Sequence, residues 1–226
     1  MRMLAVFEKS ERIRHIGHLD IQRSVQRGLR RSNLPVAYSN GFNPHILITF
    51  ASALSTGACG LREIMDVTMA AEVSETEFLE RMNSAMPPEL HLLEARKVDD
   101  RHPAMMGLLR AAQYDLTLRD GEQAEKIIRA IPSMMSRETI PAMRKTKTAL
   151  KETDIRPLIY SLRGTDRHII TTLALTEREA CKPGMLLEAL KREAEIPEEE
   201  EVRILITRTA LLGEGTDGTL TPLEQL

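Results

Sequence analysis

The sequence contains no tryptophan, and aromatic residues make up only 3% of its 226 positions. Base-stacking surfaces and aromatic cages therefore have few side chains to use. No apolar run approaches the roughly 18 residues that a membrane-spanning helix needs, and the N-terminus lacks the charged and apolar regions of a signal peptide. We expect a cytoplasmic protein that does not interact with a membrane.

Cysteine is also scarce, because the chain has only Cys59 and Cys181, which are far apart and belong to no pair motif. Iron–sulfur clusters and structural zinc sites use about four clustered ligands. We therefore expect the chain itself to bind no cofactor and no metal. A phosphate-binding loop, a dinucleotide-binding glycine fingerprint and a nucleophile elbow are missing too, which argues against an independent catalytic activity.

Charge is distributed unevenly along a chain whose formal net charge is only -2. Residues 1–50 carry eight Lys or Arg against three Asp or Glu, whereas residues 176–226 carry six against twelve. The two ends therefore differ in electrostatic character. A positive face on a nearly neutral protein suits a polyanion or an acidic partner.

Hydrophobic periodicity and turn signals predict the order strand, helix, strand, strand, helix, strand in each half of the chain. In the first half the strands are predicted at residues 3–7, 46–54, 64–71 and 90–95, and the helices at 18–32 and 74–85. In the second half the strands are predicted at 113–118, 158–162 with further pieces from residue 139, 167–175 and 202–211, and the helices at 121–130 and 183–194.

This order is typical of an α+β protein with two tandem ferredoxin-like (βαββαβ) domains, whose sheets are mostly antiparallel with helices on one face. We place the N-terminal domain at residues 1–98, with an Arg-rich helix and a Gly-Phe-Asn-Pro-His loop. The C-terminal domain is placed at 109–212, and residues 213–226 are expected to be a flexible tail.

Four arginines give the first predicted helix a basic face. Arg23, Arg27 and Arg31 recur every four residues, so their guanidinium groups project along one side where they can follow phosphates. A solvated face that keeps the protein soluble is the competing interpretation. The nucleic-acid-binding residues predicted from this helix, from the loop at 38–45 and from a second basic run are Arg23, Arg27, Arg30, Arg31, Asn43, His45, Arg144, Lys145, Lys147 and Lys151.

Histidines near the start of this helix permit two further interpretations. His15, His18, Asp20 and His45 include ligand types that suit zinc, but the spacing around the helix start does not require the rings to converge. One imidazole, from His18 or His45, is a candidate general base for ribonucleolytic cleavage. We favour positioning roles, in which these groups fix the helix start and the loop.

Several segments carry a family resemblance. Gly-His-Leu-Asp at residues 17–20, Tyr-Ser-Asn-Gly-Phe-Asn-Pro-His at 38–45, and Lys-Glu-Thr-Asp-Ile-Arg-Pro at 151–157 together resemble the radical-SAM-linked family of uncharacterised domains. The family pattern has Ser where this chain has Gly17. The resemblance implies a radical SAM protein as partner, and that partner would carry the iron–sulfur cluster and S-adenosylmethionine.

The sequence thus predicts an accessory or substrate-binding subunit of a radical SAM enzyme that recognises RNA through a basic cleft. Two alternatives stay open. One is a metal-independent endoribonuclease that uses His18 or His45, since the element order also resembles the RNA-processing endonucleases of CRISPR systems. The other is a protein–protein adaptor that does not bind nucleic acid. The oligomeric state is not predicted.

Overall fold

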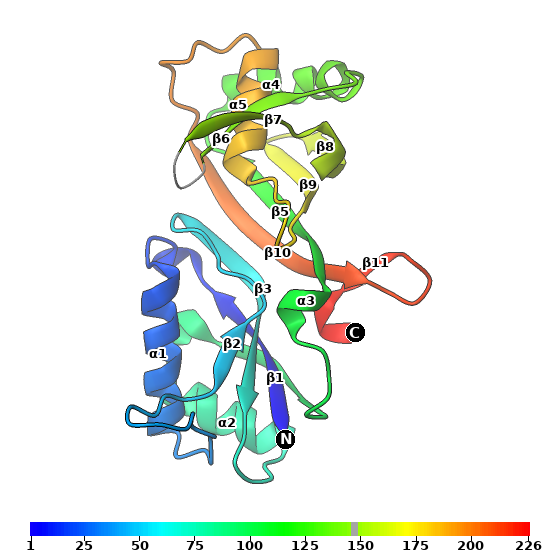
Figure 1. Cartoon of the computed structure of the whole chain (residues 1–226). Coiled ribbons are helices and arrows are strands. Elements are labelled where there is room, and N and C mark those ends of the chain that lie inside the picture. The colour runs from blue at the N-terminus through cyan, green and yellow to red at the C-terminus, as the bar shows by residue number, and fades with distance from the viewer. Residues whose placement is uncertain (146–148) are drawn as a thin grey trace. The chain divides into compact units, whose positions relative to one another are not determined.

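A computed structural model of the chain describes residues 1–145 and 149–226, apart from the side chain of Lys145. It shows an α+β protein with two compact units (Figure 1). Unit 1 comprises Met1–Leu109 and Ala210–Leu226, and unit 2 comprises Arg110–Thr209. Within the described ranges, no helix is long and apolar enough to cross a membrane.

Unit 1 begins with the predicted order of elements. The strands are β1 (Arg2–Lys9), β2 (Ile48–Phe50), β3 (Ala58–Thr68), β4 (Leu92–Val98) and β11 (Leu220–Pro222), and the helices are α1 (His18–Arg31), α2 (Glu75–Ala85) and α3 (Met105–Leu108). Strand β1 pairs antiparallel with β3 and with β4, while β2 pairs antiparallel with β3. The resulting strand order is β4-β1-β3-β2, with α1 following β1 and α2 following β3.

Helices α1 and α2 pack on the same face of this sheet. Alternate residues of β1, such as Met3 and Phe7, belong to one buried cluster with Val25 of α1 and with Phe78 and Met82 of α2. Side chains return to the same face of a strand every two residues and to the same side of a helix about every 3.6 residues. Each element therefore presents a row of apolar side chains to this core. Ser74 caps the start of α2, since its side chain accepts a hydrogen bond from the backbone N–H of Glu77.

The other face of the unit 1 sheet contacts the last residues of the chain. Strand β11 pairs with the end of β10 (Ile204–Glu214), and Leu223 is completely buried. Arg62 of β3 pairs with Glu224, and the guanidinium of Arg96 donates to the carbonyl of Leu226 at 2.6 Å. Residues 213–226, which we expected to form a flexible tail, are therefore folded onto unit 1. Apolar burial and these polar contacts explain the difference.

Unit 2 contains one more pair of strands than the βαββαβ order requires. Its elements are β5 (Leu109–Leu118), α4 (Gly121–Met135), β6 (Pro141–Lys145), β7 (Leu150–Asp154), β8 (Ile159–Thr165), β9 (His168–Ala174), α5 (Pro183–Glu193) and the first part of β10. Strand β9 pairs antiparallel with β5 and β8. Strands β6 and β7 form a separate antiparallel hairpin. The strand pieces expected from residue 139 are this hairpin and β8.

Helix α4 is longer than its predicted range of 121–130, because it continues through Pro132 to Met135. A proline inside a helix removes one backbone hydrogen bond and crowds the preceding turn. Ile127, Ile131 and Met134 nevertheless continue the buried stripe across this position. Their burial outweighs the local preference of Pro132 for ending the helix.

Candidate anion-binding site

The basic face of α1 exists as the sequence predicts. Arg23, Arg27, Arg30 and Arg31 are all exposed, while Ile21, Val25 and Leu29 are buried on the opposite side of the helix. Arg23 forms an exposed ion pair with Asp20, with 2.9 Å between the nearest nitrogen and oxygen. In the described part of the chain, Arg27 and Arg30 make no ion pair, so their guanidinium groups are available to a ligand.

Two of these arginines line a hollow of about 980 Å³ between α1 and α2. We call it the arginine hollow. Its lining residues are Ser24, Arg27, Arg31, Ser32, Glu80, Arg81, Ser84, Ala85, Met86 and Pro87. Three guanidinium groups, several hydroxyl groups and a single carboxylate thus surround one open depression. This set of groups suits a phosphate or a carboxylate, because a planar guanidinium group can donate two parallel hydrogen bonds to either one.

Arg81 was not among the residues predicted from the sequence. Its Nε donates to the backbone oxygen of Ser32 at 2.9 Å, and its Nη1 pairs with Glu77 one turn earlier at 2.7 Å. Arg31 likewise donates to the backbone oxygen of Ala85. These bonds across the two helices hold both arginines in place, which reduces the entropy lost when they bind an anion.

The loop at residues 38–45 is fixed at its ends rather than at its tip. Ser39 and His45 bond to each other three times: the Ser39 N–H donates to the His45 carbonyl, the His45 N–H donates to Ser39 Oγ, and that Oγ lies 2.8 Å from His45 Nδ1. Asn43 is exposed, and Phe42 is fully exposed. Phe42 is therefore not a core anchor.

His45 lines a different depression of unit 1, with a volume of about 370 Å³. Arg2 and Asp66 also line this depression, and they form an ion pair with each other. The hydrogen bond to Asp66 is the main reason why the pKa of Arg2 is raised. Neither Asn43 nor His45 lines the arginine hollow, so the structure does not bring these predicted residues into it.

The other two histidines of the predicted group, His15 and His18, lie in different surroundings. His18 packs edge-on against Phe50, with 5.2 Å between the ring centroids, and lines a very small cavity with Lys9 and Glu63. His15 is exposed. Among the described residues, no group of three or more His, Cys, Asp or Glu side chains is arranged to hold a metal ion.

The second basic run belongs to the β6–β7 hairpin of unit 2. Arg144 stands directly opposite Lys151 in the antiparallel register, and Lys145 stands opposite Leu150. Two like charges facing each other across strands repel, so an anion bound near Arg144 and Lys151 would relieve that repulsion. Lys147 lies outside the described residues.

Both cysteines are buried free thiols. Burial raises the pKa of Cys181 to about 12, so this thiol stays protonated at neutral pH. Because the thiolate is the form that attacks electrophiles and binds metals, Cys181 is not suited to either role in the folded chain.

Comparison with known proteins identifies a family but no activity. Residues 2–183 match the family described as an uncharacterized protein conserved in bacteria (DUF2344), and since this range is most of the chain, the protein belongs to that family. No curated protein matches the chain. The matched range includes the whole arginine hollow as well as His18 and His45.

Proposed function

We propose that this protein is a substrate-binding accessory subunit of a radical SAM enzyme and that it recognises RNA. The observation that carries the RNA part is the arginine hollow, where Arg27, Arg31 and Arg81 converge from two helices. The radical SAM partner is inferred from the resemblance of residues 17–20, 38–45 and 151–157 to the radical-SAM-linked family. In this proposal the partner carries the cluster and S-adenosylmethionine, and this chain has no catalytic activity of its own.

Phosphodiester groups fit the arginine hollow by chemistry and by size. A guanidinium group donates two parallel hydrogen bonds to a phosphate, and its charge persists at every physiological pH. A hollow of about 980 Å³ is large enough for several groups of a ligand rather than one small ion. Single-stranded RNA carries one phosphate per nucleotide on a flexible backbone, so several of its phosphates can lie along an open depression.

We also propose that both units are ferredoxin-like domains. In unit 1 the support is the βαββαβ order of elements and the strand order β4-β1-β3-β2. In unit 2 the strands β10-β5-β9-β8 follow the corresponding order, and the β6–β7 hairpin is then an insertion after α4. Fold alone does not define a function, so the RNA proposal depends on the arginine hollow.

The test is RNA binding as a function of salt concentration. We would measure the affinity for a fluorescently labelled single-stranded RNA by anisotropy, for the wild-type chain and for the triple variant Arg27→Gln, Arg31→Gln, Arg81→Gln. For single strands each neutralised phosphate adds about 0.7 to the salt slope. Loss of three contacts should therefore lower the slope by about 2 and weaken binding at low salt by at least about tenfold.

The matched control is the triple variant Arg12→Gln, Arg129→Gln, Arg203→Gln. These three arginines are exposed by 85%, 74% and 78%, and the control removes the same total charge from outside the hollow. It should retain most of the affinity. Equal losses in the two triple variants, or no RNA affinity at low salt, would refute the proposed interface.

A second candidate function is RNA cleavage by His45. One observation favours it: Ser39 Oγ fixes Nδ1 of this exposed imidazole, which leaves Nε2 free of that bond. Cleavage that is lost in His45→Ala while RNA binding persists would support this nuclease. Complex formation with a radical SAM protein in the absence of RNA, together with no RNA affinity, would instead identify a protein–protein adaptor.

A further inference from the structure

Unit 2 has a hollow of its own between the β6–β7 hairpin and α5, with a volume of about 520 Å³. Its lining combines apolar side chains with a few charged ones: Ala142, Met143, Leu150, Gly184, Met185, Glu188, Lys191, Arg192, Ile196 and Glu198. Both the size and this composition are typical of small-molecule sites. Neither the predicted site residues nor the arginine hollow includes any of these side chains.

Lys191 is the unusual member of this lining, because it is a lysine with only 6% of its surface exposed. Its ammonium group donates to the backbone oxygen of Glu198 at 3.3 Å, and no other partner occurs among the described residues. An ammonium group has three donors. Burying a cation with donors left over is costly unless a counter-charge approaches it. An anionic group in the hollow would supply that counter-charge.

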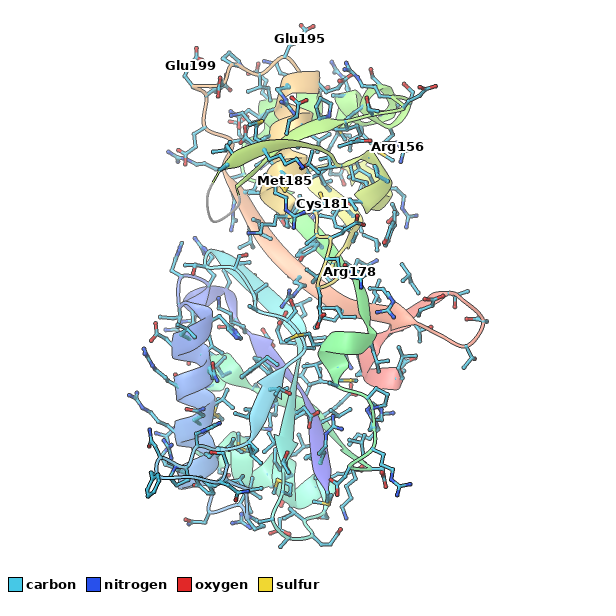
Figure 2. All side chains as sticks on the ribbon, in the orientation of Figure 1. Arg156, Arg178, Cys181, Met185, Glu195 and Glu199 are labelled. Atoms are coloured by element: carbon cyan, nitrogen blue, oxygen red, sulfur yellow. The ribbon has the colours of Figure 1, made fainter. Side chains whose placement is uncertain are left out.

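The walls beside Lys191 are apolar and adaptable. Met185 lies near the start of α5 (Figure 2), while Met143 and Leu150 come from the two strands of the hairpin. Met143 is 49% exposed and Leu150 is 63% exposed. Methionine side chains adjust to irregular shapes at little cost. They can therefore pack against the flexible apolar chain of a ligand.

The other charges at this hollow restrict the ligand. Glu188 and Glu198 are exposed carboxylates in its lining. Two carboxylates repel a polyanion, such as a nucleic acid or an oligophosphate, more strongly than they repel a ligand with a single negative charge. Arg192 is already engaged, since it donates to the backbone oxygen of Pro141. A ligand with one negative group and an uncharged apolar body meets all of these conditions.

We propose that unit 2 binds a small amphipathic carboxylate in this hollow. The carboxylate pairs with the ammonium of Lys191, and the apolar chain lies against Met143, Leu150, Met185 and Ile196. This site differs in chemistry from the arginine hollow, which has three guanidinium groups and few large apolar side chains. The proposal does not depend on RNA binding or on a radical SAM partner.

The experiment is a titration of the full chain with octanoate, followed by NMR of ¹³C-methyl-labelled methionine. Single Met143→Leu and Met185→Leu variants assign the two relevant resonances among the 12 methionines. Both resonances should shift with octanoate and saturate. Octylamine, which has the same chain length and the opposite charge, should bind at least about tenfold more weakly, because a charge-assisted hydrogen bond is replaced by repulsion.

The variant Lys191→Met removes the charge but keeps the length of the side chain. It should weaken octanoate binding by about tenfold or more and leave the weak binding of neutral 1-octanol unchanged. Lys126→Met is the matched control, since Lys126 is an exposed lysine on α4. Absence of shifts at Met143 and Met185, or equal affinity for octanoate and octylamine, would overturn the proposal. That ligand comparison uses the wild-type chain and stands even if Lys191→Met fails to fold.

Discussion

Lys9 is a buried cation whose role is visible in three hydrogen bonds. Its ammonium donates to the backbone oxygens of Arg14, Ile16 and Ala58 at 2.9 to 3.0 Å. Arg14 and Ile16 belong to the segment that leads into α1, and Ala58 is the first residue of β3. One side chain at the end of β1 therefore holds the segment before α1 against the sheet.

We expect Lys9→Met to destabilise the folded chain by about 3 kcal/mol, because three buried or partly buried carbonyl groups would lose a charged donor. Urea unfolding followed by circular dichroism measures the change. Hydrogen exchange at residues 10–17 should rise more than elsewhere, since the variant releases this segment. Arg12→Met, at an exposed position, should change stability by less than about 0.5 kcal/mol. Similar stabilities for the two variants would contradict this role of Lys9.

At the scale of single residues, the sequence predicts exposure better than it predicts neighbours. The four-residue spacing of Arg23, Arg27 and Arg31 correctly placed them on the solvent side of a helix. It did not reveal that Arg23 would pair with Asp20, nor that Arg81 would join the hollow from α2. Periodicity within one helix contains no information about which residues of a second helix face it.

Gly28 of α1 lies against Met86, the residue that follows α2. A Cβ at this glycine would overlap the sulfur of Met86 and lie 3.2 Å from its Cγ. Met86 also lines the arginine hollow. The absence of a side chain at Gly28 thus lets the helix pair close beneath the hollow.

The variant Gly28→Val should therefore be destabilised by about 2 kcal/mol or more, since overpacking exceeds any gain in helix propensity. It should also weaken RNA binding, because Met86 and the adjoining part of α2 must move away from Arg27. Thermal unfolding and anisotropy measure the two effects. Gly107→Val is a suitable control, because a Cβ at Gly107 has open space around it. A fully stable Gly28→Val variant would show that the helices can separate without cost.

At the scale of elements, long amphipathic segments were predictable and short or exceptional ones were not. The prediction of 18–32 for the first helix differs from α1 by one residue at its end. The β6–β7 hairpin was predicted only as strand pieces, because its two strands are short and mostly exposed and therefore lack a clear alternation. The last part of α4 was not predicted, because Pro132 locally favours the end of a helix. Tertiary packing overrides that preference.

At the scale of the whole molecule, unit 1 is built from two pieces of chain. Its second piece, Ala210–Leu226, contributes Leu223, which has no exposed surface, and Glu224, which pairs with Arg62 at 2.6 Å. Arg62 also pairs with Glu94, and these two hydrogen-bonded carboxylates raise its pKa. Residues 213–226 were expected to form a flexible tail, because the sequence could not show which distant residues Leu223 and Glu224 would contact.

We expect Leu223→Ala to destabilise unit 1 by about 2 to 4 kcal/mol, through lost burial and the cavity that remains. Limited proteolysis should then cut residues 215–226 first, and hydrogen exchange should increase in β11. Leu220→Ala provides the control, because Leu220 is 40% exposed and its truncation leaves little cavity. Equal protease sensitivity of the two variants would mean that Leu223 does not anchor this segment.

The division of unit 1 into two pieces also affects the order in which the protein matures during synthesis. Unit 2 is one continuous stretch, so it has all of its residues as soon as Thr209 leaves the ribosome. Unit 1 starts first but finishes last, because Leu223 and Glu224 are translated after the whole of unit 2. Until then Arg62 lacks one of its two carboxylates and the nascent sheet lacks its last strand. During synthesis, all residues of the inserted unit are therefore available before all residues of the unit that contains the arginine hollow.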